Sequence, residues 1–176
     1  MERSSSNARV FWGIGTTVVL ADAFTKMLAV DRLVPSLLPR AVLGDAVRLT
    51  LVYNPGAAFG LHLGPYSRWI FTLLTLGALL LLWRLYQGTH RADRLRTLAL
   101  SLVCGGAVGN LLDRLKSARG VVDFIDVGVG VHRWPTFNVA DMAVSCGALL
   151  LAFVLWREDA EAAARATSGR DAPIQG

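Results

Sequence analysis

Four long apolar segments constrain this chain more than any other feature of its sequence. The second is the clearest, because no residue between Arg68 and Arg84 is charged and a tryptophan stands near each end. About twenty helical residues cross a hydrocarbon core of about 30 Å. We therefore expect a membrane protein, mainly α, with four transmembrane helices. They are predicted at residues 10–30, 66–86, 97–112 and 137–156.

The composition favours a membrane protein and argues against a nucleic-acid partner. The chain is 53% hydrophobic and 18% charged, which is a low share of charge for a soluble domain of 176 residues. Its five tryptophans fall near the predicted ends of the apolar segments, as in the aromatic belts of membrane proteins. The net charge is +5, but the arginines are scattered and lack the interleaved aromatic residues of a nucleic-acid-binding face.

The segments between the apolar stretches carry weaker signals. Val47 to Tyr53 alternates and is rich in β-branched residues, so it predicts a strand in a small β-sheet. Asn54, Pro55 and Gly56 follow it and signal a turn. We expect a β region at residues 31–65, with a second short strand at 59–63, and a polar excursion at 115–135. Residues 158–176 are expected to form a flexible tail, and residues 1–176 a single domain.

The first apolar segment has two interpretations. Arg3 and Arg9 followed by Ala21-Asp22-Ala23 are typical of the charged start and cleavage site of a secretory signal peptide. The apolar pattern continues beyond the supposed cut, however, which favours a transmembrane helix that is retained.

Two residue pairs inside the apolar segments predict contacts. Asp22 and Lys26 are four residues apart, so they can form an ion pair on one helical face and lower the cost of burying each other. Gly105 and Gly109 form a G-x-x-x-G pattern, the spacing that lets membrane helices approach closely.

Charge near the helix ends predicts the orientation. The connection between the second and third segments carries Arg84, Arg91, Arg94 and Arg96, which the positive-inside rule places in the cytoplasm. Four spans then put both termini on the cytoplasmic side. Polar residues at the other helix ends are expected to converge at the opposite membrane surface: Asp22, Lys26, Asn54, Asn110, Asp113, Arg114, Asp123, Asn138 and Asp141.

Two of these residues, Asp123 and Asp141, form a candidate catalytic pair. Asp141 opens the last apolar segment, where a charge is costly and commonly marks function. Asn138 lies three residues earlier, on the same helical face. Two neighbouring carboxyl groups retain one proton between them, so one can activate a water while the other polarises a carbonyl group. The pair predicts acid/base peptide hydrolysis without a metal or another cofactor.

Other chemistries find less support. The three histidines lie in different loops, and the sequence has no H-E-x-x-H motif and no nucleophile with a matching histidine. Cys104 and Cys146 lie in apolar segments and are expected to be buried small side chains. The residue pattern alone leaves open a small transporter or channel with a polar path through Asp22, Lys26 and Asp141. It also leaves open a scaffold with buried ion pairs, although the inverted repeats typical of transporters are not evident.

Five motifs, in order, resemble those of the bacterial lipoprotein signal peptidases (signal peptidase II, aspartic intramembrane peptidases). The resemblance extends from the first apolar segment to the last. The motifs are Asp22 with Thr25-Lys26, Asn54 to Gly60, Gly105 to Arg114, Val122-Asp123-Phe124 and Phe137 to Asp141.

This resemblance implies roles for the candidate residues. Asp123 and Asp141 would be the catalytic dyad, and Asp22 and Lys26 would support the fold. Five further residues would surround the dyad and bind substrate, namely Asn54, Gly56, Asn110, Arg114 and Asn138.

The resemblance also implies a substrate and a location. The enzyme would remove the signal peptide of prolipoproteins, cutting before a diacylglyceryl-modified cysteine at the outer face of the bacterial inner membrane. An extracytoplasmic sheet from residues 31–65 would cradle the substrate, and the loop before the last helix would cover the active site. Globomycin-type lipopeptides would inhibit the enzyme, membrane lipid would surround it, and a monomer would suffice.

Overall fold

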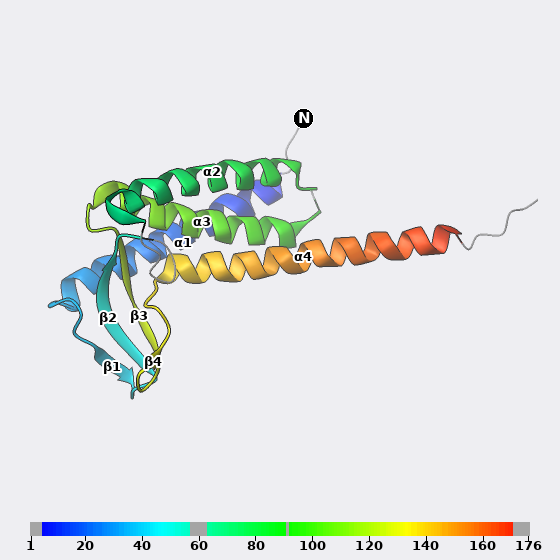
Figure 1. Ribbon diagram of the computed structural model, residues 1–176. Helices are drawn as coiled ribbons and strands as arrows, with labels where there is room; N and C mark the ends of the chain where they lie inside the picture. Colours follow the sequence, from blue (N-terminus) through cyan, green and yellow to red (C-terminus); the bar gives the residue numbers. More distant parts are fainter. Residues whose placement is uncertain (1–4, 57–62, 91, 171–176) are drawn as a thin grey trace, which may run out of the picture.

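Four helices dominate the computed structural model, which describes residues 5–56, 63–90 and 92–170 (Figure 1). Each of the four is long and apolar enough to cross a membrane, so the expectation of a mainly helical protein with four such helices is confirmed. Figure 1 shows the N-terminus and the α2–α3 connection at one end of the bundle and the sheet at the other. The helices are α1 (Ser5–Arg32), α2 (Ser67–Gly88), α3 (Arg94–Lys116) and α4 (Val139–Arg170), and a short 3-10 helix, η2 (Gly64–Tyr66), precedes α2.

The last helix extends beyond the end predicted from hydropathy. The sequence ends it at residue 156 and predicts a flexible tail from residue 158, whereas α4 is helical to Arg170. The extension is rich in alanine, the strongest helix former. Within it Glu161 forms ion pairs with Arg157 and Arg165 at 3.3 and 3.5 Å, both at a spacing of four residues. Local helix propensity therefore carries α4 past its apolar part.

A four-stranded antiparallel sheet lies at the other end of the bundle, in the order β1-β2-β3-β4. The sequence places the sheet within residues 31–65, but half of it comes from the stretch predicted as a polar excursion. β3 starts with four buried residues in succession and so lacks the alternation by which a strand is recognised. The second strand predicted at residues 59–63 lies mostly outside the described residues. The observed strands are β1 (Arg40–Leu43), β2 (Val47–Asn54), β3 (Val121–Val129) and β4 (His132–Arg133).

A β-bulge interrupts β2 beside the part of β3 that carries Asp123. Leu49 pairs with Ile125 and Val52 with Asp123, so β2 advances three residues while β3 advances two. Such a bulge changes the direction in which nearby side chains point. It allows the consecutive residues at positions 50 and 51 of β2 both to be buried.

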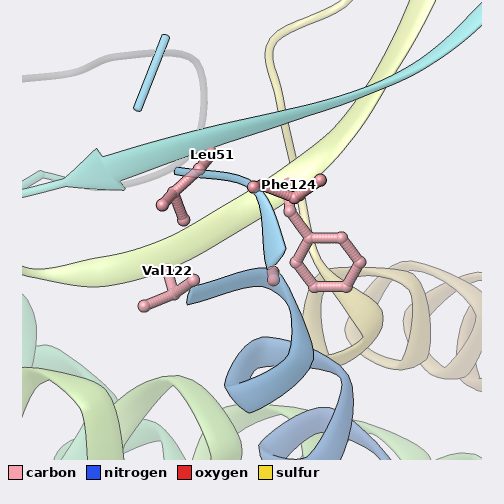
Figure 2. Packing of buried hydrophobic residues seen from close by; sticks show 5 residues of the cluster. Leu51, Val122 and Phe124 are labelled. Carbon is pink, nitrogen blue, oxygen red and sulfur yellow. The ribbon is translucent and has the colours of Figure 1, made fainter. Parts of the chain in front are cut away.

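A small apolar cluster joins the sheet to α1 (Figure 2). Val122 and Phe124 are two residues apart on β3 and share one face of the sheet. Together with Leu51 of β2 they pack against Ala29 and Leu33 at the end of α1. The same alternation directs the residue between them, at position 123, away from this cluster.

Glycines allow α3 to lie in close contact with α1 and α4. A Cβ atom on Gly105 would come within 2.9 Å of a backbone oxygen of α1, and one on Gly106 would overlap the Ala140 carbonyl oxygen of α4. A Cβ atom on Gly109 would lie 2.6 Å from the Asp22 carboxylate. The close helix approach predicted from the G-x-x-x-G spacing is therefore confirmed.

Replacing Gly106 by alanine is expected to lower stability by about 1–3 kcal/mol, because the added methyl group would force α3 and α4 apart. Gly77→Ala in α2 is the matched control, since no atom lies within 4 Å of the position that its methyl group would take. Thermal unfolding in detergent measures both variants. An equal response of Gly106→Ala and Gly77→Ala would contradict the close packing.

Candidate functional site

Asp123 and Asp141 line one pocket of about 460 Å³ at the sheet end of the helices. Asp123 comes from β3 and Asp141 from the first turn of α4, so two distant parts of the sequence supply the carboxylates. The lining residues are Asn54, Asn110, Arg114, Val121, Asp123, Trp134, Pro135, Thr136, Phe137, Asp141, Met142, Val144, Ser145 and Cys146.

Helix capping fixes the position of Asp141. The side-chain Oδ1 of Asn138 accepts the backbone N–H of Asp141 at 2.9 Å, and Asp141 Oδ2 accepts the N–H of Asn138 at 3.2 Å. This reciprocal arrangement is a capping box, which explains the spacing of three residues. The other carboxylate oxygen of Asp141 accepts a hydrogen bond of 2.7 Å from Asn110 Nδ2.

Asp123 is held by two asparagine amides. It is only 2% exposed. Its Oδ1 accepts a hydrogen bond of 2.7 Å from Asn138 Nδ2, and its Oδ2 accepts one of 3.1 Å from Asn54 Nδ2. Asn54 also makes the turn that the sequence predicts, because its Oδ1 accepts the N–H of Gly56 at 3.0 Å. The turn therefore presents the amide group of Asn54 to the carboxylate.

The two carboxylates belong to one hydrogen-bond network. Asn138 Nδ2 also lies 3.1 Å from Asn110 Oδ1, and Asn110 in turn donates to Asp141. The path Asp123–Asn138–Asn110–Asp141 therefore links β3, α4 and α3. Because every link is a side-chain amide with fixed geometry, the network fixes the positions of both carboxylates.

Burial raises the pKa of the Asp123 carboxyl group from its usual 3.8 to about 7, and the negative charge of Asp141 contributes to the rise. Hydrogen bonds from Asn54 and Asn138 and the charge of Lys26 oppose this shift. Near neutral pH Asp123 thus exchanges its proton readily, as a general acid or base must.

Lys26 anchors the network from inside the helix bundle. It is 4% exposed, and its Nζ lies 2.7 Å from Asp22 and 2.8 Å from Asp113, with a hydrogen bond of 3.0 Å to Asn110. All three ammonium protons are therefore used. The predicted ion pair between Asp22 and Lys26 is confirmed.

Both carboxylate partners of Lys26 also hold backbone groups. Asp22 accepts the N–H of Ala140 at 2.9 Å, and Asp113 accepts the N–H of Val122 at 3.1 Å. One buried ammonium group thereby connects α1 and α3 to the start of α4 and to β3, the elements that carry the two aspartates.

Arg114 is the remaining predicted residue at the pocket. Its guanidinium group donates a hydrogen bond of 3.3 Å to the Gly56 carbonyl oxygen and experiences the charges of Asp141 and Asp123. Its Nε atom is buried and has no hydrogen-bond partner among the described residues. The residues of the predicted converging set therefore either line the pocket or belong to the buried network of contacts behind it.

Asp126 has a different environment from Asp123. It lies three residues further along β3, an odd spacing that places it on the other face of the strand. Its carboxylate pairs with Arg133 at 2.8 Å and accepts the Thr50 hydroxyl at 3.1 Å. These contacts fasten β4 to the sheet. Because the sequence does not identify β3 as a strand, it is the structure that separates the two aspartates.

Residues 134–137, in the loop before the last helix that the resemblance expects to cover the site, form one wall of the pocket, although the sequence analysis assigns none of them individually. Trp134 follows β4, and Phe137 is held against Ile125 by two backbone hydrogen bonds of 2.8 and 3.0 Å. The expectation that both cysteines are buried is wrong for Cys146, which is exposed and lines the pocket. Hydropathy cannot distinguish a side chain facing the protein interior from one facing lipid. Among the described residues, no group of three His, Cys, Asp or Glu side chains could hold a metal ion.

Comparisons with known proteins agree on one family. A family model described as signal peptidase (SPase) II matches residues 14–157. A lipoprotein signal peptidase of Burkholderia thailandensis is 40% identical over 156 residues, covering 87% of this chain and 92% of the relative. One from Paraburkholderia phymatum is 40% identical over 143 residues, covering 80% and 84%.

Solved structures show the same architecture. One, described as a bacterial membrane enzyme at 2.3 Å resolution, superposes with a TM-score of 0.74 at 28% identity and covers 86% of this chain and 90% of its own. A second bacterial membrane enzyme, at 1.9 Å resolution, gives a TM-score of 0.69 at 29% identity over 82% and 91% of the two chains.

Removing the Lys26 ammonium group is expected to destabilise the protein by about 3–5 kcal/mol in Lys26→Ala, because two carboxylates lose their buried partner. Arg32→Ala is the control, since it breaks an exposed ion pair with Asp31 at 2.6 Å and should cost at most about 1 kcal/mol. Thermal unfolding in detergent compares the two. Equal losses would show that the buried network does not anchor the site.

Proposed function

The chain belongs to the signal peptidase II family of lipoprotein signal peptidases, and from that premise we propose that it is an aspartic endopeptidase. Its substrates are prolipoproteins that carry a diacylglyceryl-modified cysteine, and it cuts the signal peptide just before that cysteine. The observation that carries the aspartic mechanism is the arrangement of Asp123 and Asp141, which line one pocket and share one amide network.

The surroundings of the two carboxyl groups suggest their roles. Because burial raises the pKa of Asp123 to about 7, Asp123 holds the shared proton near neutral pH and donates a hydrogen bond to the scissile carbonyl oxygen. Asp141 lies in the first turn of α4, where the helix dipole favours its negative charge. It therefore accepts a proton from the attacking water.

The reaction then proceeds without a covalent intermediate. Water oxygen bonds to the carbonyl carbon while its proton passes to Asp141, and the carbonyl oxygen takes the proton of Asp123. The resulting gem-diol collapses when Asp141 gives its proton to the leaving nitrogen and one hydroxyl returns its proton to Asp123. The C–N bond breaks, and both aspartates regain their starting charge states.

The position of the pocket suits a lipid-bearing peptide. Beyond the dyad, its lining continues along α4 through Met142, Val144 and Cys146, which are apolar. A signal peptide lying in the bilayer would bring its scissile bond to the start of α4. If the acyl chains supply binding energy by packing on apolar helix faces, the enzyme needs to recognise little of the amino-acid sequence of the signal peptide.

We place the active site at the extracytoplasmic face of the bacterial inner membrane, with both termini in the cytoplasm. The arginines at positions 84, 94 and 96 support this orientation through the positive-inside rule. The sheet and the segment 134–137 then cover the pocket on the outer side, where a globomycin-type lipopeptide would compete with substrate. We propose that the enzyme acts as a monomer without a cofactor, because the two aspartates alone supply both proton transfers.

Asp123→Asn and Asp141→Asn are each expected to lower the turnover of a lipidated prolipoprotein by about 100- to 10,000-fold, because each removes one proton-transfer group. Asp126→Asn is the matched control on the same strand and should keep most of its turnover per folded molecule. A gel assay of precursor cleavage, with circular dichroism to verify folding, measures all three. Wild-type turnover in either dyad variant would exclude that residue from catalysis.

The pH dependence tests the proposed protonation of Asp123. Turnover should fall as pH rises through about 7, because the carboxyl group then loses the proton it must donate. Asn54→Ala removes a hydrogen bond that favours the ionised form, so the alkaline limb should move to higher pH. Thr50→Val, which touches Asp126 instead, should leave the limb in place. A shift to lower pH in Asn54→Ala would contradict the assignment.

A further inference from the structure

The turn between β3 and β4 presents apolar side chains to the outside. Val129 is 73% exposed, Val131 90% and Trp134 57%. Gly130 makes the turn with a positive φ of 56°, and no atom lies within 4 Å of the position a Cβ would take there. Single exposed apolar residues are common, but three within six residues at one turn form a patch that water does not favour. We name residues 129–134 the β3–β4 tip.

The level of the tip relative to the helices indicates what covers it. The hydrogen bond between Asp22 and Ala140 puts the first turn of α4 beside residue 22 of α1. α1 continues for ten more residues to Arg32, about 15 Å of helix. In this part Phe24, Met27 and Val30 are 56%, 60% and 39% exposed. The apolar outer surface of α1 therefore extends well past the level at which the chain enters α4.

The sheet runs across the helix axes. Figure 1 shows its long strands β2 and β3 extending away from the bundle across the direction of α2, α3 and α4, with β4 at their far end. β4 is followed directly by the segment that leads into α4. The β3–β4 tip thus extends sideways from the bundle at the depth where α1 still presents apolar side chains. At that depth the tip therefore lies level with the exposed apolar side chains of α1.

Charges beside the tip are neutralised within the protein. The Asp45 carboxylate accepts the N–H of Gly130 at 2.7 Å and pairs with Arg48. Arg133 pairs with Asp126 at 2.8 Å and donates a hydrogen bond of 2.6 Å to the Asp45 carbonyl oxygen. Moving this end of the sheet out of bulk water would therefore remove the hydration of few unpaired charges.

We propose that the β3–β4 tip rests in the interface of the bilayer that the four helices span, in the leaflet on the sheet side. Val129 and Val131 lie among the headgroups and the first acyl carbons, and Trp134 lies at the headgroup level, where tryptophan is enriched in membrane proteins. The occupant of this surface is phospholipid. The contact does not depend on which residues are catalytic.

This contact ties the height of the pocket to the membrane surface. β3 carries Asp123 near the end opposite the tip, and the chain leaving the tip passes through Trp134 and Phe137, which line the pocket, before it reaches Asn138. Lipid held against the tip therefore sets the depth of both carboxylates relative to the acyl chains of a substrate.

A fluorescent label tests the location directly. Val131→Cys in a Cys104→Ala/Cys146→Ala background is labelled with an environment-sensitive thiol-reactive dye and reconstituted in phosphatidylcholine–phosphatidylglycerol vesicles. Its emission should shift to the blue, iodide should quench it weakly, and lipids spin-labelled near the headgroup should quench it strongly. Ala118→Cys is the matched control, because Ala118 is exposed in the turn between α3 and β3, at the opposite end of β3 from the tip and between the charged residues Lys116 and Arg119.

Two outcomes of this measurement overturn the proposal. Equal iodide quenching of the labels at positions 131 and 118 would place the tip in water. Self-quenching of the label that grows with the protein-to-lipid ratio would identify a second copy of the chain as the partner. Neither readout needs an active enzyme, so the result is independent of the proposed mechanism.

Activity provides a second test. Val131→Asp should lower prolipoprotein processing in vesicles by about fivefold, which corresponds to about 1 kcal/mol for a charge near the interface, and leave processing in detergent unchanged. With circular dichroism verifying that the variant is folded, an equal loss in both media would show that the effect does not come from lipid contact, and no loss in vesicles would show that the tip does not contact lipid. Either result would overturn the proposal.

Discussion

The buried ammonium group of Lys26 is the interaction on which the rest of this structure depends. A lone charge in the apolar bundle would be too costly to bury, and Lys26 is stable there only because Asp22 and Asp113 neutralise it. Each of these carboxylates also holds a backbone N–H, one at the start of α4 and one in β3. Compensation of a single charge thus determines where the elements that carry the two pocket aspartates meet.

The capping of α4 follows the same principle of compensation. Every helix leaves its first backbone N–H groups without partners, and in a membrane protein water does not readily satisfy them. Asn138 and Asp141 satisfy two of these groups at once, and the remaining amide protons and carboxylate oxygen connect to Asp123 and Asn110. The groups that begin the helix are therefore also the groups that form the pocket.

Much of this arrangement could be predicted from the sequence, and the exceptions have physical reasons. Hydropathy predicts four helices, and a spacing of four predicts the Asp22–Lys26 pair, because both depend on local periodicity. The strands β3 and β4 cannot be predicted in this way, because the buried start of β3 lacks the alternation of polar and apolar residues. The hydrogen-bond partners of Asn110 and Asn138 also cannot be predicted, since a hydrogen bond between residues 28 positions apart leaves no local pattern in the sequence. The exposed Cys146 shows the same limit: in a membrane helix an apolar residue fits both lipid and core.

The placement of the two aspartates on different element types gives them different electrostatic surroundings. Asp141 lies at a helix N-terminus, where backbone dipoles favour a negative charge whatever the substrate does. Asp123 lies in a strand, which has no comparable dipole, and burial raises its pKa to about 7. Two aspartates on one helix would share one field and compete equally for a proton. Joining a helix end to a strand through Asn138 therefore keeps the two carboxylates in one hydrogen-bond network but in different surroundings.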